Sequence, residues 1–153
     1  MRGVITLKIK KFAIVLFSSV LMLAIAPSAF AKSGFGDDLS TAQPIELGYS
    51  YQSTVDSSTD PELTTYKNLT DKTIVVRPTV TSPASLNYDL FYVHYQNDGD
   101  IPLLSANDNG VGGTDFIEVT LLPGETIYFN VYGHKANQYS TTEKYLFKLN
   151  YSE

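Results

Sequence analysis

The stretch that decides the fold is TIYFNVYG, residues 126–133. Its side chains alternate between an apolar set and a more polar set, and successive side chains of a β-strand point to opposite faces. The apolar set is Ile127, Phe129 and Val131, and the opposite set is Tyr128, Asn130 and Tyr132. This alternation predicts a strand that turns its first set toward a hydrophobic core.

Two further stretches have related patterns. In residues 144–151, an apolar set opposes a mostly polar set, which again predicts a strand with one buried face. The apolar set is Tyr145, Phe147, Leu149 and Tyr151. Residues 88–95 are apolar on both faces apart from Asp89 and His94. That pattern predicts a central strand covered on each side.

Similar short runs continue along the chain, rich in Val, Ile, Thr, Tyr and Phe and separated by Asp-Pro, Ser-Pro, Asn-Gly and Pro-Gly turns. The nine candidate strands are residues 43–47, 49–55, 63–69, 73–80, 88–96, 103–107, 116–121, 126–133 and 144–151. No segment of ten residues has helical periodicity. We therefore expect an all-β chain: a single antiparallel β-sandwich or jelly roll of about eight to nine strands.

The first 31 residues have the three parts of an export signal. Residues 1–11 are basic, Phe12–Ala26 is an apolar run, and Ala29-Phe30-Ala31 is a small-x-small cleavage pattern. The apolar run would span about 22 Å as a helix, less than the roughly 30 Å hydrocarbon core of a membrane. We predict a signal peptide over 1–31, cleavage after Ala31, and a secreted product with no membrane anchor. A short entry segment, 32–38, then precedes the folded domain, 39–153.

Composition excludes several classes of function. The chain has no Cys, which removes disulfides, thiolate metal sites and cysteine nucleophiles; a cysteine-free secreted domain is typical of bacteria. The leader holds four basic residues and no acid, so its removal changes the formal charge from −5 to −9. Nucleic acids and anionic membranes need a basic surface, so we expect neither as a partner.

Several short motifs occur in an order that resembles a known family. They are the entry DDLSTAQPI (37–45), the Asp-rich turn 56–60 leading to Tyr66, NYDLFY (87–92), Pro123-Gly124 followed by YFNVYG (128–133), and the terminal YLFKL (145–149). Together they resemble the bacterial pre-peptidase C-terminal domain. This small β-sandwich is appended to many secreted proteases and occurs in the collagen-binding segments of clostridial collagenases. The resemblance covers about residues 37–151, but no protease domain accompanies it in this sequence.

The resemblance implies a calcium site, because some family members bind Ca²⁺ where the entry segment meets the loop before the third strand. The matching residues are Asp37, Asp38, Asp56 and Asp60. Ca²⁺ takes six to eight oxygen ligands, which loop carboxylates can supply. The alternative is turn chemistry, since Asp side chains bond their own backbone. The acid that usually precedes the entry pair in calcium-binding members is here Phe35 or Gly36. Calcium is the only cofactor that we expect.

Other polar residues give weaker signals. Residues 107–115, NDNGVGGTD, lack EF-hand spacing and are not repeated, so we interpret them as a Gly-rich hairpin or inter-sheet loop. His94 and His134 have no ligand-spaced partner on their own strands, and no nucleophile motif supports a triad. Asp89 lies in an otherwise apolar strand. We interpret it as a carboxylate bonded to neighbouring backbone N–H groups or hydroxyls rather than as a catalytic or metal-binding residue. We therefore expect no catalytic residues.

Tyrosine carries the functional prediction. The chain has 11 Tyr and no Trp, and tyrosine rings are frequent on binding faces. In collagen-binding relatives a Tyr-lined sheet face holds the ligand, so the resemblance implies that Tyr128 and Tyr132, with Asn130 between them, bind here. The alternative is that these rings only cover the sheet or form cross-strand pairs.

The leading hypothesis is a monomeric, secreted, non-catalytic binding module for an extracellular protein or polysaccharide, stabilised by calcium if the site is real. Two alternatives stay open: a small secreted hydrolase or protease inhibitor, and a structural matrix or envelope component that associates along a strand edge.

Overall fold

The structure is a computed structural model that describes residues 34–96, 99–100 and 104–152. Residues 32–153 are grouped as one compact unit. The expected signal peptide, 1–31, and its cleavage site after Ala31 lie outside the described residues. Among the residues described, no helix is long and apolar enough to cross a membrane.

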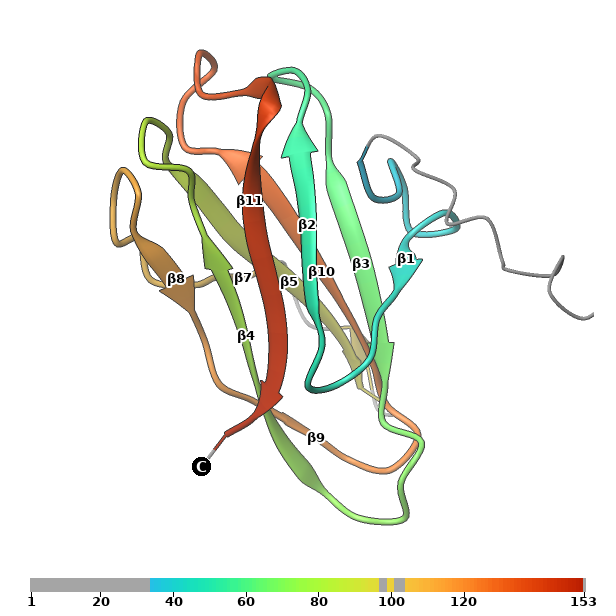
Figure 1. The fold of residues 1–153 in the computed structure, drawn as a ribbon. Coiled ribbons are helices and arrows are strands. Elements are labelled where there is room, and N and C mark those ends of the chain that lie inside the picture. Colours follow the sequence, from blue (N-terminus) through green and yellow to red (C-terminus); the bar gives the residue numbers. More distant parts are fainter. Residues whose placement is uncertain (1–33, 97–98, 101–103, 153) are drawn as a thin grey trace, which may run out of the picture. The chain divides into compact units, whose positions relative to one another are not determined.

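Two sheets pack face to face (Figure 1). Sheet A has the order β1 (Gln43–Pro44), β3 (Glu62–Lys67), β10 (Thr126–Gly133), β5 (Tyr88–Gln96) and β6 (Gly99–Asp100), and β7 (Leu104–Ser105) also pairs with β5. Sheet B has the order β2 (Ser50–Val55), β11 (Ser140–Tyr151), β4 (Ile74–Thr81) and β8 (Thr114–Phe116), and β9 (Val119–Leu121) also pairs with β4. The prediction of an all-β sandwich is confirmed.

The core lies between the sheets, where the alternation placed it. Ile127, Phe129 and Val131 of β10 are at most 1% exposed. Across the interface, Tyr145, Phe147 and Leu149 of β11 are fully buried. The rings of Phe129 and Phe147 lie 5.5 Å apart, so the central strands of the two sheets meet directly.

In β11 and β5 fewer side chains are buried than the sequence pattern predicts. Tyr151 was grouped with the core-facing residues of β11 but is 57% exposed, because the strand ends beyond the core. On β5, Tyr88, Leu90 and Tyr92 are buried, whereas Phe91 on the opposite face is only half-buried. β5 is flanked by strands on both edges but is fully covered on one face alone.

Several strand boundaries also differ from the prediction, and the described residues hold eleven strands instead of nine. The expected strand 116–121 is divided into β8 and β9, which pair with β4 in one continuous register. Pro78 of β4 lies opposite the gap, and its carbonyl accepts a bond from Ile117 there. Proline has no N–H to donate on that side, so the ladder is interrupted. β6 was not predicted.

The entry into the domain departs from a purely antiparallel arrangement. β1 pairs with β3 in parallel, with Gln43 opposite Thr64. The expected strand 43–47 ends early because the chain turns at Gly48, whose φ of 83° suits glycine. Upstream, Phe35 is 8% exposed and contacts the rings of Tyr51 and Tyr145 edge-on. The entry segment therefore contributes to the core.

Candidate functional site

The outer face of sheet A carries the predicted ligand-binding residues. Tyr128, Asn130 and Tyr132 are half-buried and lie on the face opposite the core residues of β10. In register, Tyr128 lies opposite Thr65 and Val93, Asn130 lies opposite Leu63 and Phe91, and Tyr132 lies opposite Asp89. The alternation thus placed these three side chains on the correct side of the strand.

Phe91 of β5 joins them. Its ring contacts that of Tyr132 edge-on, with centroids 6.0 Å apart. Between the two tyrosines, the Oδ1 atom of Asn130 is buried and has no hydrogen-bond partner. We call Phe91, Tyr128, Asn130 and Tyr132 the tyrosine face. It combines partly exposed rings with an acceptor that no donor satisfies.

Asp38, one of the four expected calcium ligands, organises a turn. Its Oδ1 accepts bonds from the backbone N of Ser40 and Thr41, at 2.8 and 2.9 Å, and from both hydroxyls. The Ser40 hydroxyl is the main cause that lowers the pKa of Asp38, with the Thr41 backbone next. This arrangement is the Asp turn chemistry that the sequence left open as an alternative. Asp37 is exposed beside it.

Asp56 and Asp60 share a second turn. Asp60 Oδ2 accepts a bond from the backbone N of Asp56 at 2.9 Å, and Asp56 Oδ1 is buried without a hydrogen-bond partner. Within the described part of the chain, no three of the four expected ligands bring oxygens within 4.8 Å of one another. The structure thus pairs two of the four and leaves Asp38 in its own turn.

Glu62, which no sequence motif singled out, lies beside this turn at the start of β3. It is 1% exposed, and its Oε2 accepts bonds from Phe35 N at 2.5 Å and Ser53 Oγ at 2.8 Å. Burial raises the pKa of Glu62 to about 7, and the negative charges of Asp60 and Asp56 act in the same direction. The sequence signal that could have identified it is a Glu directly after an Asp-rich turn, at the start of a strand.

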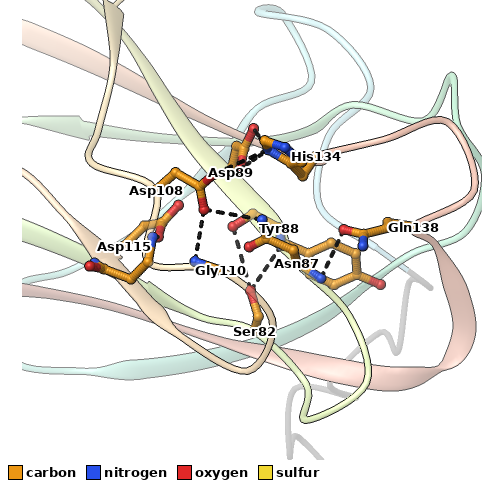
Figure 2. Close-up of polar contacts among 10 residues, drawn as sticks. Ser82, Asn87, Tyr88, Asp89, Asp108, Gly110, Asp115, His134 and Gln138 are labelled. Atoms are coloured by element: carbon orange, nitrogen blue, oxygen red, sulfur yellow. Dashed lines mark hydrogen bonds and ion pairs between the residues drawn. The ribbon is translucent and has the colours of Figure 1, made fainter.

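A second polar cluster forms where β5, β10 and the loop after β7 come together (Figure 2). His134 Nδ1 lies 3.2 and 3.1 Å from the two carboxylate oxygens of Asp89, and 3.4 Å from Asp108 Oδ2. One ligand atom from each residue lies within 4.8 Å of the others. The side chains of His134 and Asp108 are 37% and 43% exposed, and that of Asp89 is 21% exposed.

The loop between β7 and β8 brings Asp108 to this cluster. It crosses from sheet A to sheet B, as the inter-sheet interpretation required, and Gly110 and Gly112 have φ of 77° and 68°. Asp108 Oδ1 accepts bonds from Asn87 Nδ2 at 3.1 Å and from Gly110 N at 2.8 Å. These bonds, that of Asn87 first, lower the pKa of Asp108. Asp108 Oδ2 is left to face His134.

A third carboxylate lies close by. Asp115 is 2% exposed and accepts a bond from Asn109 N at 2.9 Å. Burial is the main cause that raises the pKa of Asp115, and the charges of Asp89 and Asp108 add to it. Burial also raises the pKa of Asp89, against the hydrogen bond of His134. The expected backbone or hydroxyl partner of Asp89 is instead an imidazole.

Asp89 and His134 have the contact found in the acid–histidine half of a catalytic triad, where the carboxylate holds the Nδ1 side of the ring. In the described ranges, no hydroxyl forms a hydrogen bond with the other ring nitrogen.

Comparison with known proteins identifies the fold. No family model matches the chain, and no curated protein matches it. Among solved structures, the crystal structure of the pre-peptidase C-terminal domain of the collagenase from Bacillus anthracis is similar, with a TM-score of 0.50. The similarity covers 71% of this chain and 93% of that domain, at 13% sequence identity. The chain thus has the fold of a pre-peptidase C-terminal domain, as the motif order predicted.

Proposed function

We propose that this protein is a secreted, non-catalytic binding module whose tyrosine face holds an extended extracellular protein. The observation that supports it is the placement of Tyr128 and Tyr132 on the outer side of β10, with Phe91 packed against Tyr132. Aromatic rings with a polar tip provide contact area at a small cost in conformational entropy. Secretion is supported by the basic, apolar and small-x-small parts of residues 1–31.

Collagen is the first ligand to test. The similar solved domain comes from a collagenase, which makes a collagen-like ligand the nearest candidate. Collagen chains adopt the extended polyproline II conformation, which aromatic-lined surfaces recognise. Polysaccharides share the stacking chemistry but lack the proline rings, so they are the alternative that the experiment separates.

The experiment is co-sedimentation of the purified chain with insoluble collagen, peptidoglycan, chitin and cellulose. We expect retention on collagen, reduced at least about fivefold by Tyr128→Ala or Tyr132→Ala, which corresponds to roughly 1 kcal/mol. Tyr49→Ala is the matched control, because Tyr49 is 61% exposed outside the tyrosine face. Retention on a polysaccharide alone would change the ligand class, and no retention on any polymer would refute the binding module.

Calcium binding by Asp37, Asp38, Asp56 and Asp60 belongs to the same proposal, as a stabilising rather than a catalytic role. The buried, unpartnered Oδ1 of Asp56 supports it, because a cation would satisfy that oxygen. The Glu62 carboxyl, whose pKa the charges of Asp60 and Asp56 raise, is close enough to this turn to be a further candidate ligand.

A further inference from the structure

We propose that Asp89, Asp108 and His134 form a binding site for a divalent metal ion of the zinc type, distinct from the tyrosine face and from the proposed calcium site. The ion would fasten the loop between β7 and β8 to sheet A. The three residues come from β5, from that loop, and from the position directly after β10.

The distances suit one small ion. Zinc ligands lie about 2.0–2.2 Å from the metal in a tetrahedron, which separates neighbouring ligand atoms by about 3.3–3.6 Å. His134 Nδ1 lies 3.1 Å from Asp89 Oδ2 and 3.4 Å from Asp108 Oδ2. An ion can therefore replace the proton between these atoms with small side-chain adjustments.

Neighbouring groups already orient the ligands. Asn87 Nδ2 and Gly110 N hold Asp108 Oδ1, which leaves Asp108 Oδ2 directed to His134 (Figure 2). Asn87 is 5% exposed, its side chain points to Asp108, and its own Oδ1 is buried without a hydrogen-bond partner. Its backbone carbonyl also accepts a bond from His134 N at 2.9 Å. Such outer contacts fix ligand geometry in metal sites and raise metal affinity.

Charge favours a cation at this place. Asp89 and Asp108 both contact one imidazole, the charge of the buried Asp115 acts on both carboxylates, and among the described residues no Lys or Arg forms an ion pair with the cluster. Clustered carboxylates without compensating charge are costly out of water. An imidazole nitrogen with carboxylate oxygens suits zinc and its neighbours, whereas calcium takes oxygen ligands. The partial exposure of His134 and Asp108 gives the ion a route from solvent and leaves a fourth ligand position for water.

The test is calorimetric titration of the untagged, chelator-treated chain with ZnCl₂ at pH 7, together with melting curves in Zn²⁺ and in Ca²⁺. We expect one Zn²⁺ per chain and a melting temperature that rises with Zn²⁺, because the folded state alone holds the three ligands together. Both effects should be lost in His134→Gln and Asp108→Asn. Asn87→Ala should weaken Zn²⁺ binding by about 10–100-fold.

Asp71→Asn, at an exposed acid outside the cluster, is the control and should bind Zn²⁺ as the unchanged chain does. Asp108→Asn keeps the size of the side chain, so it decides the matter if His134→Gln fails to fold. Visible absorption of bound Co²⁺ gives a second readout of nitrogen and oxygen ligation. Zn²⁺ uptake that persists in both ligand variants, no uptake at millimolar Zn²⁺, or a response to Ca²⁺ alone at this cluster would each overturn the proposal.

Discussion

Glu62 is a buried acid whose Oε2 accepts hydrogen bonds from Phe35 N and Ser53 Oγ. Because burial raises its pKa from 4.5 to about 7, the folded state binds the proton more tightly than the unfolded state does. The contribution of Glu62 to the free energy of unfolding is fully present below about pH 4.5 and is lost as the pH rises toward 7. Melting curves across this range, in chelator, should show the melting temperature of the unchanged chain decreasing relative to that of Glu62→Gln.

Glu62→Gln keeps the side-chain shape and removes the titration, so the difference between the two melting curves isolates this carboxyl. Equal pH profiles for the two proteins would mean that Glu62 is not held in a protonated form by burial.

The side chain of Asn68 forms several hydrogen bonds that connect the end of β3 in sheet A to β9 in sheet B. It is fully buried; its Nδ2 donates to the carbonyls of Lys72, Leu121 and Leu122, and its Oδ1 accepts from Thr70. Asn68→Ala leaves these carbonyls without their donor, so we expect a loss of about 2–4 kcal/mol in urea unfolding. Asn150→Ala, at an exposed position on β11, is the control and should cost under about 0.5 kcal/mol.

At the scale of the element, one face of β10 packs in the core and the opposite face carries the proposed ligand-binding rings. Phe129→Ala should lower the free energy of unfolding by about 3–5 kcal/mol, because the ring is fully buried against Phe147. Tyr128→Ala and Tyr132→Ala should cost the fold less, since both rings are half-buried, while weakening ligand binding by more than about 1 kcal/mol. Urea midpoints and polymer affinity, measured on the same three variants, check both effects.

If the tyrosine variants unfold as readily as Phe129→Ala, the rings serve the sheet and the binding face is elsewhere. If they bind as the unchanged chain does, the tyrosine face is not the ligand surface.

The strands differ in how far the sequence could predict them. The facing of β10 and β11 follows from a period of two that is local to each segment, so Ile127 and Phe147 were placed correctly. The division between β8 and β9 depends on Pro78, which lies on another strand. β1 and β7 lie within the expected strands 43–47 and 103–107 but have only two residues each, because their extent depends on neighbouring strands, and no local pattern marks β6.

At the scale of the molecule, calcium binding must appear in the stability of the whole domain. If Asp37, Asp38, Asp56 and Asp60 hold Ca²⁺ only when the chain is folded, the melting temperature rises with Ca²⁺ concentration. Asp60→Ala should abolish that rise, whereas Asp108→Asn should leave it intact. An unchanged melting curve between chelator and millimolar Ca²⁺ would return these acids to turn formation alone.

The candidate sites show the same limit of prediction. Tyr128, Asn130 and Tyr132 share one strand, so their alternation could identify them as a set. Asp89, Asp108 and His134 lie far apart in the chain, and although Asp89 and His134 each stood out in their own segments, no local pattern linked the three. Only the pairing of β5 with β10 and the course of the inter-sheet loop bring them together.

The position of β11 has a consequence for how the chain folds. β11 lies in the interior of sheet B, between β2 and β4, and places Lys148 opposite Ser50 (Figure 1). Before residues 140–151 are available, β2 has no partner strand and β4 is paired only on its other edge, with β8 and β9, and pairing between strands so distant in sequence is slow. A chain that is still incompletely folded can pass through a translocation channel. If the expected leader directs the chain across a membrane, this topology would favour a chain that is still incompletely folded when it reaches the channel.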